Sequence, residues 1–202
     1  MGENRELLSH QSNSFRDKRS FVIEFDNKIY RALDDHAFND LNDFINTELY
    51  LELKKENKMV STRVIRNLPQ RFDENYKNFV EHSKINFISY VHNWTFNMLK
   101  DAAILTLEIQ KRLIEKDYSL KDATPYNIQF LKSKPIFIDM GSIEKYNGEA
   151  IWYGYKQFCE MFLYPLILCE SLKINLQDIY PITSRGISAK STWKMIKFLI
   201  LV

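Results

Sequence analysis

The stretch SLKDATPYNIQFLKSKPIFIDMGS, residues 119–142, holds three side chains with metal-binding oxygens. Asp122 and Asn127 stand five residues apart, and Asp139 follows Asn127 by twelve, with the short apolar run PIFID before it. Phosphoryl transfer from a nucleotide needs such a set, because one carboxylate orients or deprotonates the acceptor while an amide oxygen and a second carboxylate hold Mg²⁺ against the phosphates. The spacing therefore predicts a site for Mg²⁺ and a nucleotide.

Turn chemistry is the alternative interpretation of the same residues. Asp and Asn cap hairpins and helices routinely, so each residue taken alone is more typical of a turn. Their combined spacing around a strand, after an apolar helix, favours the metal site. Ser142 and Glu144 follow directly, and for these two a surface β-turn is a simpler interpretation than extra contacts to metal or phosphate.

The N-terminal part of the chain is predicted to be rich in strands. FVIEF and KIYRAL are apolar runs separated by the turn formers Asp26 and Asn27, which predicts a β-hairpin. Residues 37–55 carry apolar side chains at helical spacing, with Asp34 or Asp35 as the N-cap. The run MVSTRVI then predicts another short strand.

The C-terminal part is predicted to be mainly helical. Apolar residues recur at every third or fourth position from Trp94 to Leu113, which predicts one buried face of a long helix. IWYGYKQFCEMFLYPLILCESL predicts a second apolar helix, bent or ended near Pro165. Its aromatic residues are more typical of a core than of a platform for a base. The last run, STWKMIKFLILV, is apolar without a capping signal, which predicts a fold truncated at the C-terminus.

Composition and charge exclude several classes of function. The chain has 202 residues, with 28 basic and 26 acidic side chains interspersed, so no basic stripe for nucleic acid is expected. The sequence contains no window of 18 uncharged apolar residues, so no membrane span is expected. Its polar start does not fit a secretory signal. Cys159 and Cys169 lack a CxxC pattern, which favours free thiols and a cytoplasmic protein.

The order of these elements resembles the C-lobe of protein kinases. KDATPYN and DMG, after a long helix and around a short strand, are similar to the kinase catalytic loop and its metal-binding DFG turn. This resemblance makes Asp122 the catalytic aspartate, Asn127 the magnesium-binding asparagine and Asp139 the second metal ligand, with Mg²⁺ and ATP as cofactors. It implies an α+β, protein-kinase-like fold with a small strand-rich N-lobe and a mainly helical C-lobe. We expect a polar arm over residues 1–19, an N-lobe-like region over 20–70 and a C-lobe-like region over 71–202.

The chain departs from the kinase pattern on the phosphate side. The usual His before the catalytic Asp is absent from the string LKD, where Lys121 is a candidate for nucleotide binding. Residues 3–140 contain no glycine, so the glycine-rich loop whose backbone N–H groups cradle phosphates is missing. For the ion-pair lysine, Arg31 is the nearest candidate, with Glu48 as its partner and Lys28 as the reserve. Arginine can still pair a phosphate in a bidentate way.

A second resemblance covers most of residues 80–172. EHSKINFISYVHNWTFNMLKDAAILTLEIQ, LKDATPYNIQF, PIFIDMGSIE and WYGYKQFCEMFLYPLIL are similar to the N-terminal kinase-like region of bacterial proteins labelled class I SAM-dependent methyltransferases, relatives of nodulation proteins. The resemblance implies SAM only through a methyltransferase domain outside this chain, which has no glycine-rich turn of its own for SAM. Three functions stay open: a degenerate nucleotide- and Mg²⁺-binding domain, an active small phosphotransferase, and a non-catalytic docking module for a methyltransferase domain or protein.

Overall fold

A computed structural model describes residues 20–66, 77–146, 148 and 151–200. The polar arm expected over residues 1–19 lies outside the described residues. The described chain divides into two compact units, each presented by itself below. The N-terminal unit takes the residues up to Lys84 apart from Glu56–Met59, and the C-terminal unit takes Glu56–Met59 with the residues from Ile85 onward. The expected α+β architecture is confirmed, because the first unit is built on a sheet and the second mainly on helices.

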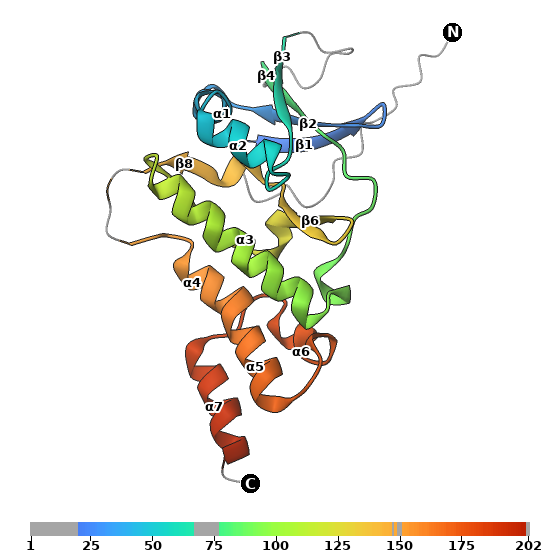
Figure 1. Ribbon diagram of the computed structural model, residues 1–202, viewed down its shortest axis with the longest axis vertical. Coiled ribbons are helices and arrows are strands. Elements are labelled where there is room, and N and C mark those ends of the chain that lie inside the picture. Colours follow the sequence, from blue (N-terminus) through green and yellow to red (C-terminus); the bar gives the residue numbers. More distant parts are fainter. Residues whose placement is uncertain (1–19, 67–76, 147, 149–150, 201–202) are drawn as a thin grey trace. The chain divides into compact units, whose positions relative to one another are not determined.

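The N-terminal unit contains a four-stranded antiparallel sheet with the order β1-β2-β4-β3 (Figure 1). Its strands are β1 (Ser20–Phe25), β2 (Lys28–Leu33), β3 (Thr62–Ile65) and β4 (Asn78–His82). The predicted hairpin is confirmed, since Asp26 and Asn27 take φ values of 49° and 59° between β1 and β2. These left-handed conformations suit Asp and Asn better than other residues with a Cβ, which explains the tight two-residue turn.

The helical stretch predicted over residues 37–55 forms two helices, α1 (Asp35–Ile45) and α2 (Glu48–Lys55). Asp34 caps α1, as predicted, because its carboxylate accepts a hydrogen bond from Ala37 N–H at 2.7 Å. The helical spacing does not give one continuous helix, because Thr47 interrupts it. Its hydroxyl donates to the Phe44 carbonyl at 2.7 Å and accepts from Tyr50 N–H at 3.2 Å, so it ends one helix and begins the next.

A buried polar cluster joins α2 to strands β3 and β4. The hydroxyl of Tyr50 accepts from Thr62 N–H at 2.6 Å, and Thr62 Oγ1 lies 2.8 Å from His82 Nδ1. His82 is only 6% exposed. Burial, reinforced by the nearby Arg31 guanidinium, lowers the pKa of His82 from 6.5 to about 3. The imidazole is therefore neutral in the folded protein at any ordinary pH.

We expect this histidine to make the fold sensitive to acid. Below pH 6.5 the unfolded chain binds a proton at His82 while the folded chain does not until about pH 3, so stability is lost as the pH falls through this window. The free energy of unfolding should fall by up to about 1.4 kcal/mol per pH unit from this group. Urea unfolding of the wild type and His82→Asn at pH 7.5 and 5.0 measures the difference. Equal losses of stability in the two proteins would contradict the assignment.

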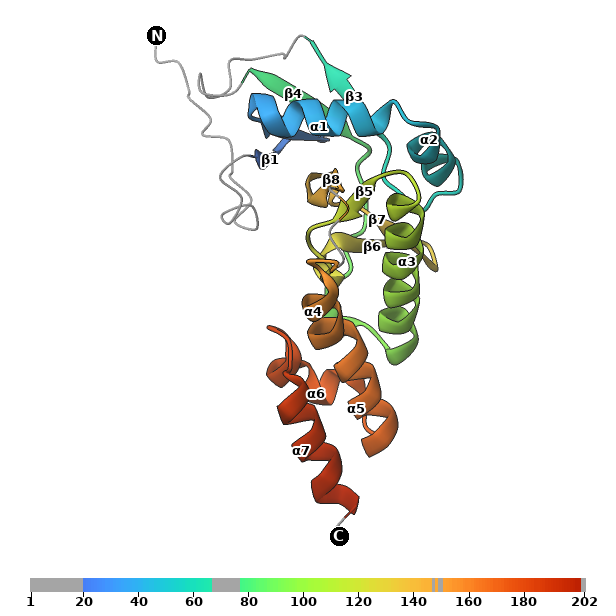
Figure 2. The ribbon, with the colours of Figure 1, turned by 90° about the vertical axis from the view of Figure 1, so that its left-hand side faces the viewer.

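The C-terminal unit is organised around α3 (Phe96–Ile114) and two small antiparallel sheets beside it (Figure 2). The sheets pair β5 (Tyr118–Leu120) with β8 (Ile143–Lys145), and β6 (Ile128–Leu131) with β7 (Lys134–Phe137). The predicted long helix is confirmed, although it begins after Trp94, with Thr95 as its N-cap. Trp94 is fully buried and packs edge-on against Phe130 of β6.

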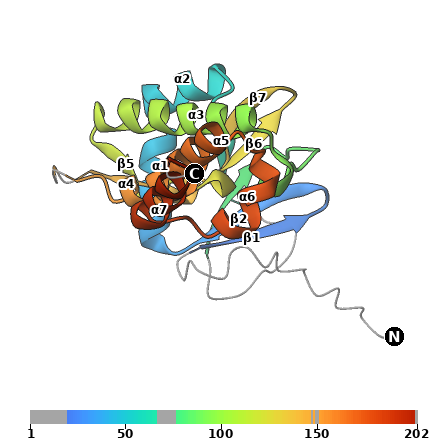
Figure 3. The ribbon, with the colours of Figure 1, turned by 90° about the horizontal axis from the view of Figure 1, so that it is seen from below.

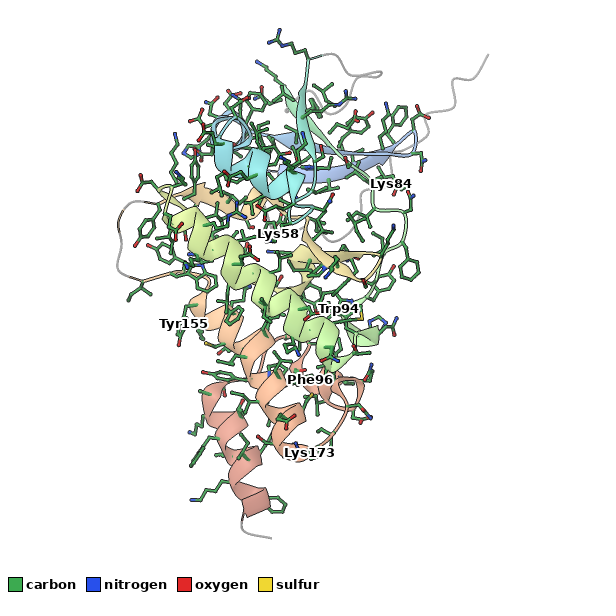
Figure 4. The ribbon with its side chains drawn as sticks, in the orientation of Figure 1. Lys58, Lys84, Trp94, Phe96, Tyr155 and Lys173 are labelled. Atoms are coloured by element: carbon green, nitrogen blue, oxygen red, sulfur yellow. The ribbon has the colours of Figure 1, made fainter. Side chains whose placement is uncertain are left out.

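The segment Glu56–Met59 belongs to this second unit although it precedes β3 in the chain. Phe137 N–H donates to the Lys58 carbonyl at 2.9 Å, and Met59 pairs with Phe137 as an isolated parallel bridge. The Lys58 ammonium lies beside α3 (Figure 4) and contacts Glu56 at 2.8 Å and Glu108 at 2.5 Å. These ion pairs raise the pKa of Lys58 and help to fix the segment against the helix.

The second predicted apolar helix is present but contains a change of helical type. α4 (Tyr155–Phe158) continues into a π-helix, Cys159–Leu163, and then into α5 (Tyr164–Leu172). Pro165 has no N–H to donate, so it cannot bond to a carbonyl one turn earlier. The carbonyl of Glu160 instead accepts from Ile187 N–H at 2.9 Å. The distortion predicted near Pro165 is a π-helical turn, and the carbonyl of its Glu160 bonds to another segment.

Two further helices, α6 (Leu176–Thr183) and α7 (Ala189–Ile200), pack against α5 (Figure 3). The two cysteines predicted to be free thiols are both free and buried. None of the described helices is both long enough and apolar enough to span a lipid bilayer.

Candidate functional site

The two small sheets of the C-terminal unit place the loops that carry Asp122, Asn127 and Asp139 next to one another. In the β6–β7 sheet, Ile138 N–H donates to the Asn127 carbonyl at 2.8 Å, which extends the pairing to the residue before Asp139. In the β5–β8 sheet, Lys121 N–H donates to the Ser142 carbonyl at 2.8 Å, which extends that pairing to the residue before Asp122. The backbone thus brings Asp122, Asn127 and Asp139 to adjoining ends of the two ladders.

Asn127 ends a 3-10 turn, Pro125–Asn127, and its side chain is buried at 8% exposure. Its Oδ1 accepts a hydrogen bond from Thr124 Oγ1 at 3.2 Å, and its Nδ2 donates to the Asp122 carbonyl at 3.4 Å. These contacts fix which way the amide points, and an amide oxygen can accept at a second lone pair. Asn127 therefore combines an oriented side chain with an oxygen that can bind a cation.

Asp139 lies at the exit of β7 and is held by the residues that follow it. Its Oδ1 accepts from Gly141 N–H at 3.2 Å, and its backbone carbonyl accepts from Ser142 Oγ at 2.9 Å. Ser142 is fully buried, so the interpretation of this residue as part of a surface turn was wrong. Its hydroxyl and carbonyl instead join the Asp139 turn to the strand that leads into Asp122.

Three further side chains hold the backbone around Asp122, and sequence reasoning did not assign them to the site. Gln110 of α3 is buried, and its Oε1 accepts from Leu120 N–H at 2.8 Å while its Nε2 donates to Ser119 Oγ at 3.1 Å. Trp152 Nε1 donates to the Leu120 carbonyl at 2.6 Å. Gln157 Oε1 accepts from Ala123 N–H at 2.7 Å. A glutamine on the mainly apolar buried face of α3 was the sequence signal for such a role.

The candidate nucleotide-binding residues fall in both units. Lys121 is exposed beside Asp122 in the C-terminal unit. Arg31 lies on β2 of the N-terminal unit and is buried, at 9% exposure. Glu48 is exposed at the first position of α2, where a carboxylate is favourable near the helix N-terminus. The Arg31 and Glu48 assignments stay predictions.

Contacts from Lys84 hold the β1–β2 turn of the N-terminal unit in place. The ammonium of Lys84, labelled in Figure 4, contacts the carboxylate of Glu24 at 2.6 Å and Oδ1 of Asn27 at 2.5 Å. A two-residue turn with Asp26 at its tip offers a negative charge where a phosphate cradle would offer backbone N–H groups. This turn is therefore unsuited to hold phosphates in the way a glycine-rich loop does.

The donor set of the site fits magnesium rather than zinc. Two carboxylates and one amide oxygen are hard ligands, and Mg²⁺ is usually held by one or two carboxylates together with water and phosphate oxygens. No group of three or more His, Cys, Asp or Glu side chains in the described part of the chain is arranged to hold a metal by itself.

Comparisons with known proteins give one relative and two structures of note. No family model matches the chain. Nodulation protein NoeA of Rhizobium meliloti (strain 1021) is 34% identical over 187 residues, which make up 92% of this chain and 39% of NoeA. The chain thus spans about two fifths of the length of this relative. The match confirms the expected resemblance to a nodulation protein.

Two of the solved structures that this chain resembles are kinases. The PK-1 kinase of Cydia pomonella granulovirus gives a TM-score of 0.44 at 10% identity, over 68% of this chain and 55% of PK-1. The Lpg2603 kinase of Legionella pneumophila, bound to IP6, gives a TM-score of 0.40 at 12% identity, over 93% of each chain. The chain is thus similar in sequence to part of a rhizobial nodulation protein, and kinases are among the solved structures that it resembles.

Proposed function

We propose that this chain is a kinase-like domain that binds Mg²⁺ and ATP at the adjoining loops of Asp122, Asn127 and Asp139. One observation carries the proposal: the backbone hydrogen bonds Ile138 to Asn127 and Lys121 to Ser142 bring all three residues to neighbouring loop ends. An amide oxygen and two carboxylates in one place are the protein's share of a Mg²⁺-nucleotide site.

In this proposal each residue has a separate task. Asn127 and Asp139 hold the metal, which would neutralise charge on the phosphates. Asp122 orients the acceptor hydroxyl and accepts its proton. Lys121 supplies positive charge for the phosphates, whereas Arg31 and Glu48 keep the predicted role of an ion pair within the N-terminal unit.

The missing glycine-rich loop favours ATP binding as the primary function. Phosphoryl transfer requires more contacts to the phosphates than ATP binding does. The chain has no glycine from residue 3 to residue 140, so it has no glycine-rich loop over this range. Backbone N–H contacts to the phosphates are therefore fewer than in a domain with a glycine-rich lid. We infer that the metal contributes most of the affinity, so ATP without Mg²⁺ should bind weakly.

A thermal-shift screen tests this function. The melting temperature is measured with ATP, ADP and SAM, each with Mg²⁺ and with EDTA. ATP and ADP are expected to stabilise the protein only with Mg²⁺, because a ligand that binds only the folded state stabilises it in proportion to RT ln(1 + [L]/Kd). SAM is expected to give no shift. No shift with any ligand, or a shift with SAM alone, would overturn the proposed function.

A second candidate function is docking to a methyltransferase domain, favoured by the longer chain of NoeA. The unmatched part of NoeA, purified separately, supplies the test. Co-elution of that part with this chain in size-exclusion chromatography would support docking, and independent elution at micromolar concentrations would count against it. The chain could both bind Mg²⁺-ATP and dock to a methyltransferase domain. The thermal-shift screen therefore tests only binding, and co-elution tests only docking.

A further inference from the structure

Helix α7 carries a stripe of three lysines along its outer face. Lys190, Lys194 and Lys197 follow one another at intervals of four and three residues, so their side chains leave the helix on the same side. All three are exposed. Residues 179–202 contain these lysines and Arg185 but no Asp or Glu. The balanced charge of the whole chain therefore hides a local concentration of positive charge.

Two exposed aromatic rings flank the lysine stripe, one on each side. Trp193 is 63% exposed and Phe198 is 72% exposed. Trp193 stands three residues after Lys190, and Phe198 stands four residues after Lys194, so each ring is a neighbour of the stripe on the helix surface. Large apolar side chains that stay in water beside polar ones mark a surface that binds something.

The opposite face of α7 is already packed against the protein. Thr192 is buried, and its hydroxyl donates to the Ser188 carbonyl at 3.0 Å. Ser188 Oγ accepts from Ser191 N–H at 3.2 Å, which caps the first turn. The helix packs against α5, and Figure 2 shows it beside α6. These contacts fix the rotation of the helix, so the lysine stripe and its two rings face away from the core.

The acidic side chains of α5 and α6 are engaged elsewhere. Glu170 of α5 forms an ion pair with Lys173. Asp178 of α6 accepts from Asn175 N–H at 3.1 Å in a capping box. Among the ion pairs of the described residues, none includes a lysine of α7. The positive charge of the stripe is therefore available to a partner.

The combination of lysines with exposed aromatic rings fits a lipid surface better than a protein surface. Lysine is depleted in the cores of protein–protein interfaces. Helices that lie in a membrane interface instead carry lysines together with Trp and Phe. Their ammonium groups attract anionic headgroups, and their aromatic rings settle at the level of the headgroups. Such a helix lies on a membrane without crossing it.

We propose that the outer face of α7 binds the surface of a membrane that contains anionic lipids. The three lysines contact the phosphate groups of the lipids, and Trp193 and Phe198 insert between the headgroups. Membrane binding goes beyond the proposed function and does not depend on it, because the three residues of the Mg²⁺ site lie outside α7. It would hold the C-terminal unit at the lipid surface.

Sedimentation with lipid vesicles tests this binding in the full chain. One set of vesicles contains phosphatidylcholine alone, and the other contains phosphatidylcholine and phosphatidylglycerol in a two-to-one ratio. The wild type should sediment with the mixed vesicles only, and less so as salt is added, because salt screens the attraction. Each lysine near an anionic surface strengthens binding about fivefold, so replacing all three lysines of α7 with Gln should weaken it about 100-fold.

Matched variants separate the lysine stripe from net charge. Replacing Lys100, Lys111 and Lys116 with Gln removes the same charge from exposed positions on α3 and just after it, so this variant should bind like the wild type. Equal losses in the two triple variants, or no sedimentation of the wild type with mixed vesicles, would overturn the proposal.

The aromatic rings have their own test. The double variant Trp193→Gln and Phe198→Gln should bind the mixed vesicles about 10-fold more weakly, because it loses the apolar area that enters the interface. Phe87→Gln is the control, since Phe87 is 76% exposed and lies outside α7. Mixed vesicles should shift the tryptophan emission of the wild type to shorter wavelength. Trp193→Phe should abolish this shift and still sediment, because Phe also enters the interface.

A protein partner is the competing occupant of this face. The unmatched part of NoeA, mixed with the wild type, is analysed by size-exclusion chromatography. Co-elution that is lost in the Trp193→Gln and Phe198→Gln double variant would make the face a protein interface and would overturn the membrane proposal. An emission shift that persists in Trp193→Phe would also overturn it. Failure of the wild type to bind Mg²⁺-ATP would overturn the proposed function and leave membrane binding standing.

Discussion

Replacing Asp139 with Asn is expected to weaken Mg²⁺-dependent ATP binding by at least about 100-fold, the upper end of the loss seen when a group supporting a metal is removed. An amide oxygen carries no full charge, so it attracts Mg²⁺ far less than a carboxylate does. The Asn side chain can still accept from Gly141 N–H as Asp139 does. The fold should therefore survive, and isothermal titration with and without Mg²⁺ measures the change directly.

Asp117→Asn provides the matched control for this experiment. Asp117 is exposed, and it has a φ of 60°, a left-handed conformation that Asn tolerates as well as Asp. The variant makes the same change of net charge outside the site, so it should bind Mg²⁺-ATP like the wild type. If both variants lose affinity equally, general electrostatics explains the effect, and Asp139 is not a metal ligand.

Replacing Asp122 with Asn is expected to lower phosphate release from Mg²⁺-ATP by about 10²–10⁴-fold, the range that a positioned general base contributes. The amide cannot accept the acceptor's proton. The Kd for Mg²⁺-ATP should change little, since Asn127 and Asp139 are intact. The two substitutions should therefore have different effects. Asp139→Asn should remove Mg²⁺-ATP binding, whereas Asp122→Asn should lower phosphate release alone.

Steady-state phosphate release and titration of the same protein batches distinguish these patterns. Asp101→Asn is a suitable control, because Asp101 is exposed on α3. Undiminished turnover in Asp122→Asn would contradict the assignment of this residue as the catalytic aspartate. Loss of nucleotide affinity in Asp122→Asn would instead assign it to the metal.

Short-range sequence patterns were enough to predict the first hairpin of the fold and one strand of the site. Asp26 and Asn27 predicted the first hairpin because only few residues adopt left-handed φ values readily. The apolar run PIFID between Asn127 and Asp139 predicted the strand β7, which is why their loop ends could be expected near each other. These features depend on neighbours within a few residues, so pattern and turn chemistry determine them.

Contacts between distant residues could not be predicted in the same way. Met59 pairs with Phe137, and Gln157 accepts from Ala123, although nothing in the spacing of these residues indicates a contact. The break at Thr47 depends on a hydroxyl that caps two helices, and helical periodicity runs straight through it. Ser142 looked like a surface residue because serine is common in turns, yet tertiary packing buries it under the Asp139 turn.

Paramagnetic Mn²⁺ in place of Mg²⁺ tests whether Asp122, Asn127 and Asp139 bind a metal and a nucleotide, because both ions are hard cations that prefer oxygen ligands. The backbone amide signals of the ¹⁵N-labelled protein are recorded with ATP and a small amount of Mn²⁺. We expect ATP-dependent broadening centred on Asp122, Asn127 and Asp139, with the signals of α7 unchanged. Broadening centred elsewhere, or none in the presence of ATP, would contradict the assignment of these residues as a metal-nucleotide site.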